Sequence, residues 1–219
     1  MIELRNISKR YGDQQVLDNI SFTINKGDFV SIVGRSGSGK STLLNIIGGL
    51  ECPDTGSVLY QGNDISKFTA SETAKYHNTS VGFVFQSFHL EPEYTVYQNV
   101  EIPLLIAGRK DRKKAVEDVL KAVGLEIPPK KVKFLSGGEC QRACIARAVI
   151  MNPDLILADE PCGNLDSHSS AIIMELLRDI VSHGRTVLLV THNVDDAHKT
   201  DRIITISDGK IISDKRISQ

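Results

Sequence analysis

Residues 34–42 read GRSGSGKST and match G-x-x-x-x-G-K-[ST], a loop that wraps nucleotide phosphates. The loop follows the apolar run Phe29–Val33 and precedes Leu43–Ile47, which is typical of a helix. Its glycines let backbone N–H groups point at phosphate oxygens, aided by the helix N-terminus. The motif therefore predicts a strand, loop and helix unit that binds a nucleoside triphosphate. The expected binding residues are Gly34, Arg35, Ser36, Gly37, Ser38, Gly39, Lys40, Ser41 and Thr42.

A second element places two carboxylates at the end of the apolar run Asp154–Glu160. Such a run is typical of a buried strand in a parallel sheet, and ligands bind at the carboxyl ends of these strands. We expect Asp159 and the Ser41 hydroxyl to hold Mg²⁺, while Lys40 reaches the β- and γ-phosphates. Glu160 would polarise a water that attacks the γ-phosphate. Together the two motifs predict a nucleotide-hydrolysing site.

Residues 135–139 read LSGGE and allow two interpretations. Ser136 and Glu139 have the spacing of a capping box, which alone would mark the start of an ordinary helix. An ordinary helix cap does not need Gly137 and Gly138, however. Two consecutive glycines have no side chains, so an anion can approach their backbone N–H groups closely. Ser136, Gly137, Gly138 and Glu139 are therefore candidates for a second phosphate-binding element.

The sequence resembles the ATP-binding subunits of ABC transporters over essentially its whole length, because six motifs stand in that family's order. In this resemblance residues 34–42 are the Walker A loop, residues 135–139 the signature and residues 155–160 Walker B. Gln86 corresponds to the Q-loop glutamine, and residues 163–166 (GNLD) correspond to the D-loop. The resemblance is strongest to the branch of lipoprotein-release, macrolide-export, antimicrobial-peptide-resistance, haem-export and cell-division ATPases. It implies an ATPase that uses ATP and Mg²⁺.

Three single residues take their roles from the resemblance. Tyr11 is expected to stack on adenine, although an aromatic residue there also fits simple packing in a turn. Gln86 would touch Mg²⁺ or water, and His192 would hydrogen-bond the γ-phosphate and hold the attacking water. The implied catalytic set is Lys40, Gln86, Glu160 and His192. The implied metal ligands are Ser41, Gln86 and Asp159.

The resemblance also implies partners. Two copies would form a head-to-tail homodimer around two ATP, and an integral membrane permease would be the driven subunit. The segment 87–97 is rich in aromatics yet holds Glu91 and Glu93, which favours a surface that docks a short permease helix. Two alternatives stay open: a signalling ATPase that gates a cell-wall hydrolase through a membrane partner, and a soluble ABC ATPase outside transport.

Composition limits the remaining choices. The 219 residues suit one α/β domain, and a net charge of −1 argues against nucleic acid as the main partner. No apolar run approaches the roughly 20 residues of a membrane span, and the N-terminus lacks a signal-peptide pattern. We expect a cytoplasmic protein that is peripheral on the inner face of the membrane through its permease. Cys140 and Cys144 are expected to be buried helix residues rather than metal ligands.

The expected fold class is α/β, a P-loop NTPase with a mixed core sheet, an antiparallel β edge layer and an inserted α-helical subdomain. Residues 1–86 and 154–219 would form the core with its β layer, and residues 87–153 the helical subdomain that carries the signature. Strands are expected at 2–8, 16–24, 29–33, 81–85, 155–158, 187–191, 203–207 and 210–213, and helices at 112–123, 138–150 and 167–183.

Overall fold

The phosphate loop joins a central strand to a buried helix in the computed structural model, which describes residues 1–125 and 130–217. Strand β3 (Phe29–Val33) leads into the loop, and α1 (Lys40–Ile47) follows it. The larger sheet around β3 has the order β10-β9-β3-β8-β7-β6. Its other strands are β6 (Val81–Phe85), β7 (Leu155–Asp159), β8 (Thr186–Thr191), β9 (Arg202–Ser207) and β10 (Lys210–Arg216).

The larger sheet is mixed, as expected. Strands β6, β7, β8, β3 and β9 run parallel, whereas β10 is antiparallel to β9. The β9–β10 hairpin turns at Asp208 and Gly209, which both have positive φ (48° and 74°). Positive φ at both central residues is the type I′ geometry that the Asp-Gly pair predicts.

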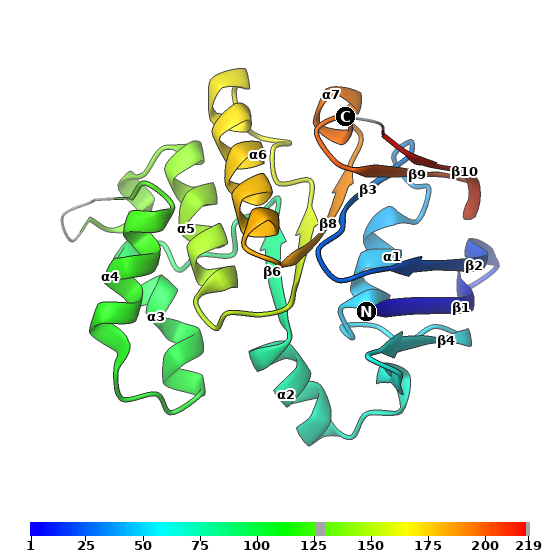
Figure 1. Cartoon of the computed structure of the whole chain (residues 1–219), viewed down its shortest axis with the longest axis horizontal. Helices are drawn as coiled ribbons and strands as arrows, with labels where there is room; N and C mark the ends of the chain where they lie inside the picture. Colours follow the sequence, from blue (N-terminus) through cyan, green and yellow to red (C-terminus); the bar gives the residue numbers. More distant parts are fainter. Residues whose placement is uncertain (126–129, 218–219) are drawn as a thin grey trace.

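A second, antiparallel sheet has the order β2-β1-β4-β5 and forms the expected edge layer. Its strands are β1 (Ile2–Tyr11), β2 (Gln14–Ile24), β4 (Thr55–Tyr60) and β5 (Asn63–Asp64). Figure 1 shows β1, β2 and β4 at one end of the molecule and α3, α4 and α5 at the other. Helices α3 (Val96–Ile106), α4 (Arg112–Ala122) and α5 (Gly137–Val149) all lie within residues 87–153.

The remaining helical segments connect or cover the sheets. They are the 3₁₀ turns η1 (Ile65–Lys67) and η2 (Val132–Phe134) and the helices α2 (Ala70–Thr79), α6 (Ser167–Ser182) and α7 (Val194–Ala197). Helices α2, α3 and α5 each begin with a capping box, at Thr69, Thr95 and Ser136. The capping interpretation of Ser136 and Glu139 is thus confirmed, with the Ser136 hydroxyl accepting from the Glu139 N–H.

Alternate residues of the central strands face two hydrophobic cores. Leu155 and Leu157 pack with α1 and the antiparallel sheet, whereas Ile156 and Ala158 pack with α3 to α6. Because side chains of a strand alternate between its faces, an uninterrupted apolar run fills both cores at once. The run that ends in Asp159 is therefore fixed on both sides, which places its terminal carboxylates firmly at the sheet edge.

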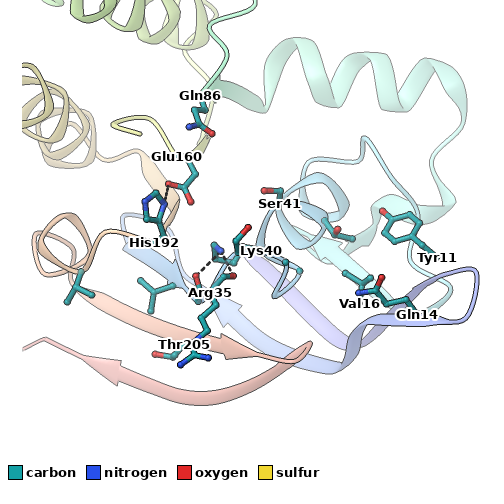
Figure 2. A pocket seen from close by; sticks show the side chains of 17 residues that line it. Tyr11, Gln14, Val16, Arg35, Lys40, Ser41, Gln86, Glu160, His192 and Thr205 are labelled. Atoms are coloured by element: carbon teal, nitrogen blue, oxygen red, sulfur yellow. Dashed lines mark hydrogen bonds and ion pairs between the residues drawn. The ribbon is translucent and has the colours of Figure 1, made fainter. Parts of the chain in front are cut away.

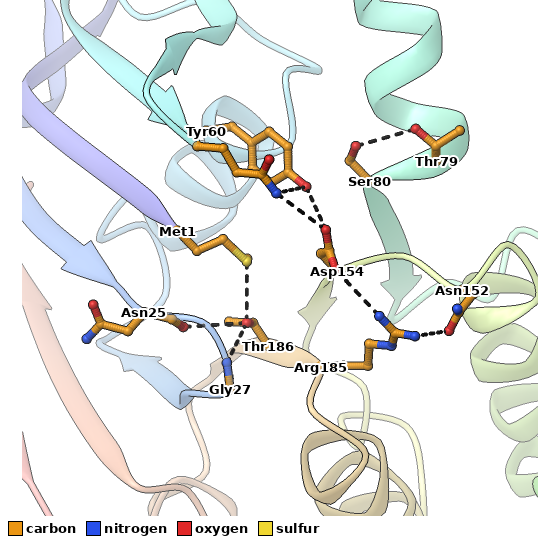
Figure 3. A network of polar contacts seen from close by, with 11 residues as sticks. Met1, Asn25, Gly27, Tyr60, Thr79, Ser80, Asn152, Asp154, Arg185 and Thr186 are labelled. Carbon is orange, nitrogen blue, oxygen red and sulfur yellow. Dashed lines mark hydrogen bonds and ion pairs between the residues drawn. The ribbon is translucent and has the colours of Figure 1, made fainter.

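A polar network ties the two sheets together before β7 and β8 begin (Figure 3). The Tyr60 hydroxyl of β4 donates to Asp154 at 3.2 Å, and Arg185 donates to the same carboxylate at 3.5 Å and to Asn152. Nearby, the Thr186 hydroxyl accepts from Gly27 N–H at 3.0 Å. These bonds hold the amino ends of the strands, opposite the edge that carries the phosphate loop.

The four cysteines form no disulfide, and only Cys52 is exposed. Cys140 and Cys144 are buried on α5, as expected, and Cys144 donates its thiol hydrogen to Phe88 O. Burial raises the pKa of Cys144 and of Cys162 to about 12. Among the described residues, no cluster of three or more His, Cys, Asp or Glu side chains suits a metal ion. In the same part of the chain, no helix has both the length and the apolar character to cross a membrane.

Candidate nucleotide site

A pocket of about 1030 Å³ opens at the carboxyl ends of β3 and β8 (Figure 2). It is lined by every predicted residue of the phosphate loop except Ser38, together with Tyr11, Gln86, Glu160 and His192. Ser38 lies buried beneath the loop. The structure thus brings together predicted site residues that are up to 181 positions apart in the sequence, Tyr11 and His192.

The loop is shaped for an anion. Gly37 and Gly39 have positive φ, and a Cβ on Gly39 would lie 2.6 Å from Val16 O. Lys40 is almost fully buried, and its ammonium donates to Gly34 O at 2.9 Å and Arg35 O at 3.0 Å. A buried cation held only by loop carbonyls, beside the N-terminus of α1, favours a negatively charged ligand. The phosphate groups of a nucleotide fit this cradle.

Two of the three expected metal ligands, Ser41 and Asp159, adjoin each other, whereas the amide of the third, Gln86, contacts Asn164. The Ser41 hydroxyl donates to Asp159 Oδ1 at 3.2 Å, although the two residues come from α1 and β7. Burial raises the pKa of Asp159, and the neighbouring charge of Glu160 raises it further, against the hydrogen bond from Ser41. A divalent cation would relieve this cost, because oxygen ligands of this kind suit Mg²⁺. The residues present therefore fit the ion.

Glu160 and His192 form a pair at the edge of the pocket (Figure 2). His192 Nδ1 lies 2.6 Å from Glu160 Oε2, and the Glu160 carboxylate is mostly buried while the imidazole is exposed. Glu160 has a φ of 49°, a conformation that non-glycine residues seldom adopt and that is concentrated at functional sites. Its backbone is held there by Glu160 N–H donating to Val190 O and Gly163 N–H donating to Glu160 O.

Gln86 lines the pocket but its amide also contacts the D-loop, donating to Asn164 Oδ1 at 3.4 Å. The signature does not reach the pocket: none of Ser136 to Glu139 lines it. Gly137 instead faces the D-loop, because a Cβ there would lie 3.3 Å from Leu165. One chain therefore assembles its phosphate loop, Glu160 and His192 around one cavity and keeps its signature elsewhere.

Tyr11 lies at the far end of the pocket from His192, where its ring is half-exposed (Figure 2). Its hydroxyl donates to Glu51 Oε1 at 2.5 Å, and this hydrogen bond raises the pKa of Tyr11. Lys9 ion-pairs with Glu51 at 3.1 Å and lies over the Tyr11 ring. The ring is thus anchored to the segment after α1 with one face available. The sequence did not reveal that Glu51 fixes the Tyr11 side chain.

Sequence reasoning missed further features of the pocket. Gln14, Val16 and Thr205 line it without carrying any motif.

Residues 25–28, outside the pocket, read NKGD, which matches the base-reading N-K-x-D of GTPases. The structure places these residues before β3, at the opposite end of that strand from the phosphate loop. There Asn25 N–H donates to Asp28 and Gly27 N–H donates to Thr186, so the match is a structural turn.

Comparison with known proteins agrees with this geometry. The profile of the ABC transporter family matches residues 17–163. An uncharacterized ABC transporter ATP-binding protein of Bacillus subtilis is 44% identical over 99% of this chain and 97% of its own length. The chain belongs to the ABC transporter family. It is an ATPase domain of that family, which confirms the expected class of protein.

Other relatives are larger. The pyoverdine export ATP-binding/permease protein of Pseudomonas aeruginosa is 45% identical over 98% of this chain, and the macrolide export ATP-binding/permease protein of Chlorobaculum tepidum is 44% identical over 99%. The chain spans about a third of the length of each, 34%. These likenesses agree with the macrolide-export branch that the sequence indicates.

Solved structures confirm the fold class. The dimeric ABC transporter cassette MJ0796 superposes with a TM-score of 0.92, 40% identity and full coverage of both chains. A second structure of that cassette, a post-hydrolysis state bound to ADP and phosphate, has a TM-score of 0.91 and 39% identity. The mixed sheet, antiparallel sheet and helices of this ABC ATPase domain are therefore those of known ABC cassettes.

Proposed function

We propose that two copies of this ABC ATPase domain hydrolyse ATP in composite sites. The observation that carries the proposal is that the signature of a chain lies apart from that chain's own nucleotide pocket. Lys40, Ser41, Glu160 and His192 share one pocket, while Ser136 lies outside it. A second copy in head-to-tail orientation would supply its Ser136, Gly137 and Gly138 to the open side of the phosphates. The dimeric cassette that resembles this chain supports that arrangement.

In the proposed reaction each side chain has one task. Lys40 binds the β- and γ-phosphates, and Ser41 and Asp159 hold Mg²⁺, which would neutralise phosphate charge. Glu160 accepts a proton from the attacking water, and His192, already hydrogen-bonded to Glu160, orients that carboxylate and the γ-phosphate. Gln86 links the metal side of the pocket to the D-loop. Tyr11 stacks on adenine.

The first test replaces the general base. Glu160→Gln keeps the size of the side chain and should still bind ATP and Mg²⁺, but hydrolysis should fall by at least about 100-fold. Because ATP then persists, the variant should elute as a dimer in size-exclusion chromatography with ATP and as a monomer without it. A variant that stays monomeric at saturating ATP and Mg²⁺ would show that the sites are not composite.

We further propose that the chain is peripheral on a membrane through a permease, whose short cytoplasmic helix docks beside the Q-loop. A cleft of about 220 Å³ lies there, between α2 and the helical segment, lined by residues that include His77, Phe85, Pro103, Arg147 and Met151. Its position supports the proposed division into a core, residues 1–86 and 154–219, and a helical subdomain, residues 87–153. The cleft suits an amphipathic helix with one apolar anchor.

We revise part of the docking surface expected from the sequence. Glu93 is paired with Lys131 at 3.0 Å and Lys133 at 2.9 Å, so part of its negative charge is already balanced within the chain. Leu90 is half-buried against the chain's own helices. Tyr94 and Glu91 remain exposed at this surface. We therefore propose the cleft near Phe85 as the main docking site and keep only the exposed Glu91 and Tyr94 from the segment 87–97.

Capture by a co-expressed permease tests this docking site. Phe85→Ala and Glu91→Lys should leave ATP binding by the isolated chain unchanged and should weaken co-purification with the permease roughly tenfold. Phe134→Ala is the matched control, because Phe134 is 62% exposed and does not line the cleft. Equal capture of all three variants would place the permease elsewhere.

A further inference from the structure

We propose that the corner between α3 and α4 binds the anionic headgroups of a lipid bilayer directly. We call the residues 105–114 of this corner the basic corner. The inference goes beyond the proposed function, because it needs neither nucleotide nor permease.

The basic corner begins with two protruding apolar side chains. Leu105 and Ile106, in the last turn of α3, are 49% and 75% exposed. Among the large apolar residues that the described chain leaves exposed, only these two are consecutive. Single exposed apolar residues are ordinary on a protein surface, but an adjacent pair beside a cluster of charges indicates an interaction site.

The cations follow at once. Residues 105–114 hold five cations and one carboxylate, a formal charge of +4, whereas the whole chain carries −1. Arg112 is paired with Glu101 at 2.7 Å, and Lys113 has a distant contact with Glu117 at 3.9 Å. Arg109, Lys110 and Lys114 are exposed and make no ion pair with any residue that the structure describes. The exposed acidic residues in and next to the basic corner are Asp111, Glu117 and Asp118. They are fewer than the cations, so the net charge of this surface stays positive.

The basic corner is held in a fixed conformation. Helix α3 is followed by Gly108 at a φ of 65°, and Arg109 N–H donates to Leu104 O at 3.0 Å. Arg112 donates to Glu101 and to Arg109 O at 2.8 Å, so it joins the start of α4 to both α3 and the turn. The free cations and the apolar pair are therefore presented together, which reduces the entropy lost on binding.

Cations next to protruding apolar side chains match the chemistry of an anionic membrane surface. The ammonium and guanidinium groups would pair with phosphates while Leu105 and Ile106 enter the interface between headgroups and acyl chains. The corner also follows Pro103, which lines the proposed permease cleft. Figure 1 shows the α3–α4 connection and α2, which borders that cleft, on the same lower edge of the molecule.

Vesicle co-sedimentation of the full chain tests the proposal. The probes are vesicles of phosphatidylglycerol and phosphatidylcholine, with pure phosphatidylcholine as the uncharged comparison. The chain should bind the anionic vesicles at low salt and leave them at 1 M NaCl, where the Debye length falls to about 3 Å. Each free cation should contribute roughly fivefold to the partition coefficient. Equal binding to uncharged vesicles would overturn the proposal.

Matched variants locate the site. Lys110→Gln with Lys114→Gln should lower the partition coefficient about 25-fold. Lys131→Gln with Lys133→Gln removes the same charge from residues already paired with Glu93 and should have less than a twofold effect. Ile106→Asp should weaken binding, whereas Ile212→Asp, at another exposed apolar residue, should not. ATPase activity of these variants should equal that of the natural chain, which shows that they are folded.

Two results would contradict the proposal. In the first, the two double lysine-to-glutamine variants lower the partition coefficient equally. Binding would then depend only on the net charge of the chain, and the basic corner would not be a specific site. If the natural chain does not bind anionic vesicles at all, the cations serve another partner, such as an acidic protein segment. Either result leaves the proposed ATPase cycle untouched, because that cycle is measured without lipid.

Discussion

At the scale of single residues, the carboxylate of Asp159 lies in partly buried surroundings that disfavour its ionised form. Its carboxylate ends a strand buried on both faces, and burial raises its pKa. A raised pKa means that the folded chain holds the proton more tightly than the unfolded chain does. Ionised Asp159 therefore lowers the stability of the metal-free protein at pH 7, and this cost disappears as the pH falls below the unfolded value near 3.8.

Asp159→Asn should separate stability from binding. With EDTA at pH 7, the variant should melt above the natural chain by on the order of 2 °C, because the amide has no charge to bury. The difference should shrink as the pH falls and vanish below the unfolded pKa near 3.8, and Mg²⁺-dependent ATP affinity should fall. Thermal unfolding across pH, with and without MgATP, measures both effects. A lower melting temperature in EDTA would mean that the hydrogen bond with Ser41 outweighs the cost of burial.

At the scale of elements, the signature caps helix α5 in addition to its proposed role in binding phosphate. Ser136 caps the helix through Glu139, and we propose that the same hydroxyl binds a phosphate of a second copy. Ser136→Asp distinguishes the two roles, because Asp caps a helix as well as Ser but repels phosphate. The melting temperature should change by less than about 2 °C, while ATPase activity should fall more than tenfold.

The same exchange at α3 is the control for that prediction. Thr95 caps α3 with Gln98 in the same capping-box geometry but lies outside the proposed phosphate sites. Thr95→Asp should therefore leave both melting temperature and ATPase activity near those of the natural chain. Equal activity in Ser136→Asp and Thr95→Asp would remove the phosphate role from the signature.

The elements with a strong periodic pattern were predictable from the sequence. Strands β3 and β6 have the predicted bounds, β7, β8, α4 and α6 differ from them by one residue at one end, and α5 lies one residue earlier at both ends. Strand β4 and helix α2 were not predicted. Helix α2 reads ASETAKYHNT and buries only Tyr76, so it shows no apolar stripe, and its signal lies in the capping box at Thr69.

The candidate site was predictable only where a motif marks it. The phosphate loop, Glu160 and His192 meet because carboxyl ends of parallel strands share one edge. The Tyr11–Glu51 bond joins residues 40 positions apart from different elements, and no local pattern encodes such a contact. The pairing of Glu93 with Lys131 and Lys133 also joins residues far apart in the sequence, so no local pattern predicted it.

At the scale of the whole molecule, composite sites predict complementation between inactive variants. Lys40→Ala removes the phosphate-binding cation, and Ser136→Arg blocks the neighbour's phosphate, so each variant alone should be inactive. In a mixed dimer, the phosphate loop of the Ser136→Arg chain meets the intact signature of the Lys40→Ala chain. An equal mixture should therefore recover about a quarter of the natural ATPase rate if the sites act independently.

Concentration dependence is the check on that result. Recovered activity should rise with total protein, because mixed dimers must form, and a mixture of Lys40→Ala with Glu160→Gln should stay inactive. Both of those substitutions lie in the same pocket, so no intact site can arise from them. Full inactivity of the Lys40→Ala and Ser136→Arg mixture at all concentrations would argue for sites built from a single chain.

The distribution of the cysteines has a practical consequence for watching the nucleotide arrive. Cys52 is exposed, while burial holds the thiols of the other three protonated. Its carbonyl accepts from Lys9, whose ammonium lies 5.6 Å from the centre of the Tyr11 ring. A maleimide dye would attach at this position alone in the natural sequence, beside the ring expected to meet the base. Its fluorescence then offers an optical reporter of base binding without any engineered cysteine.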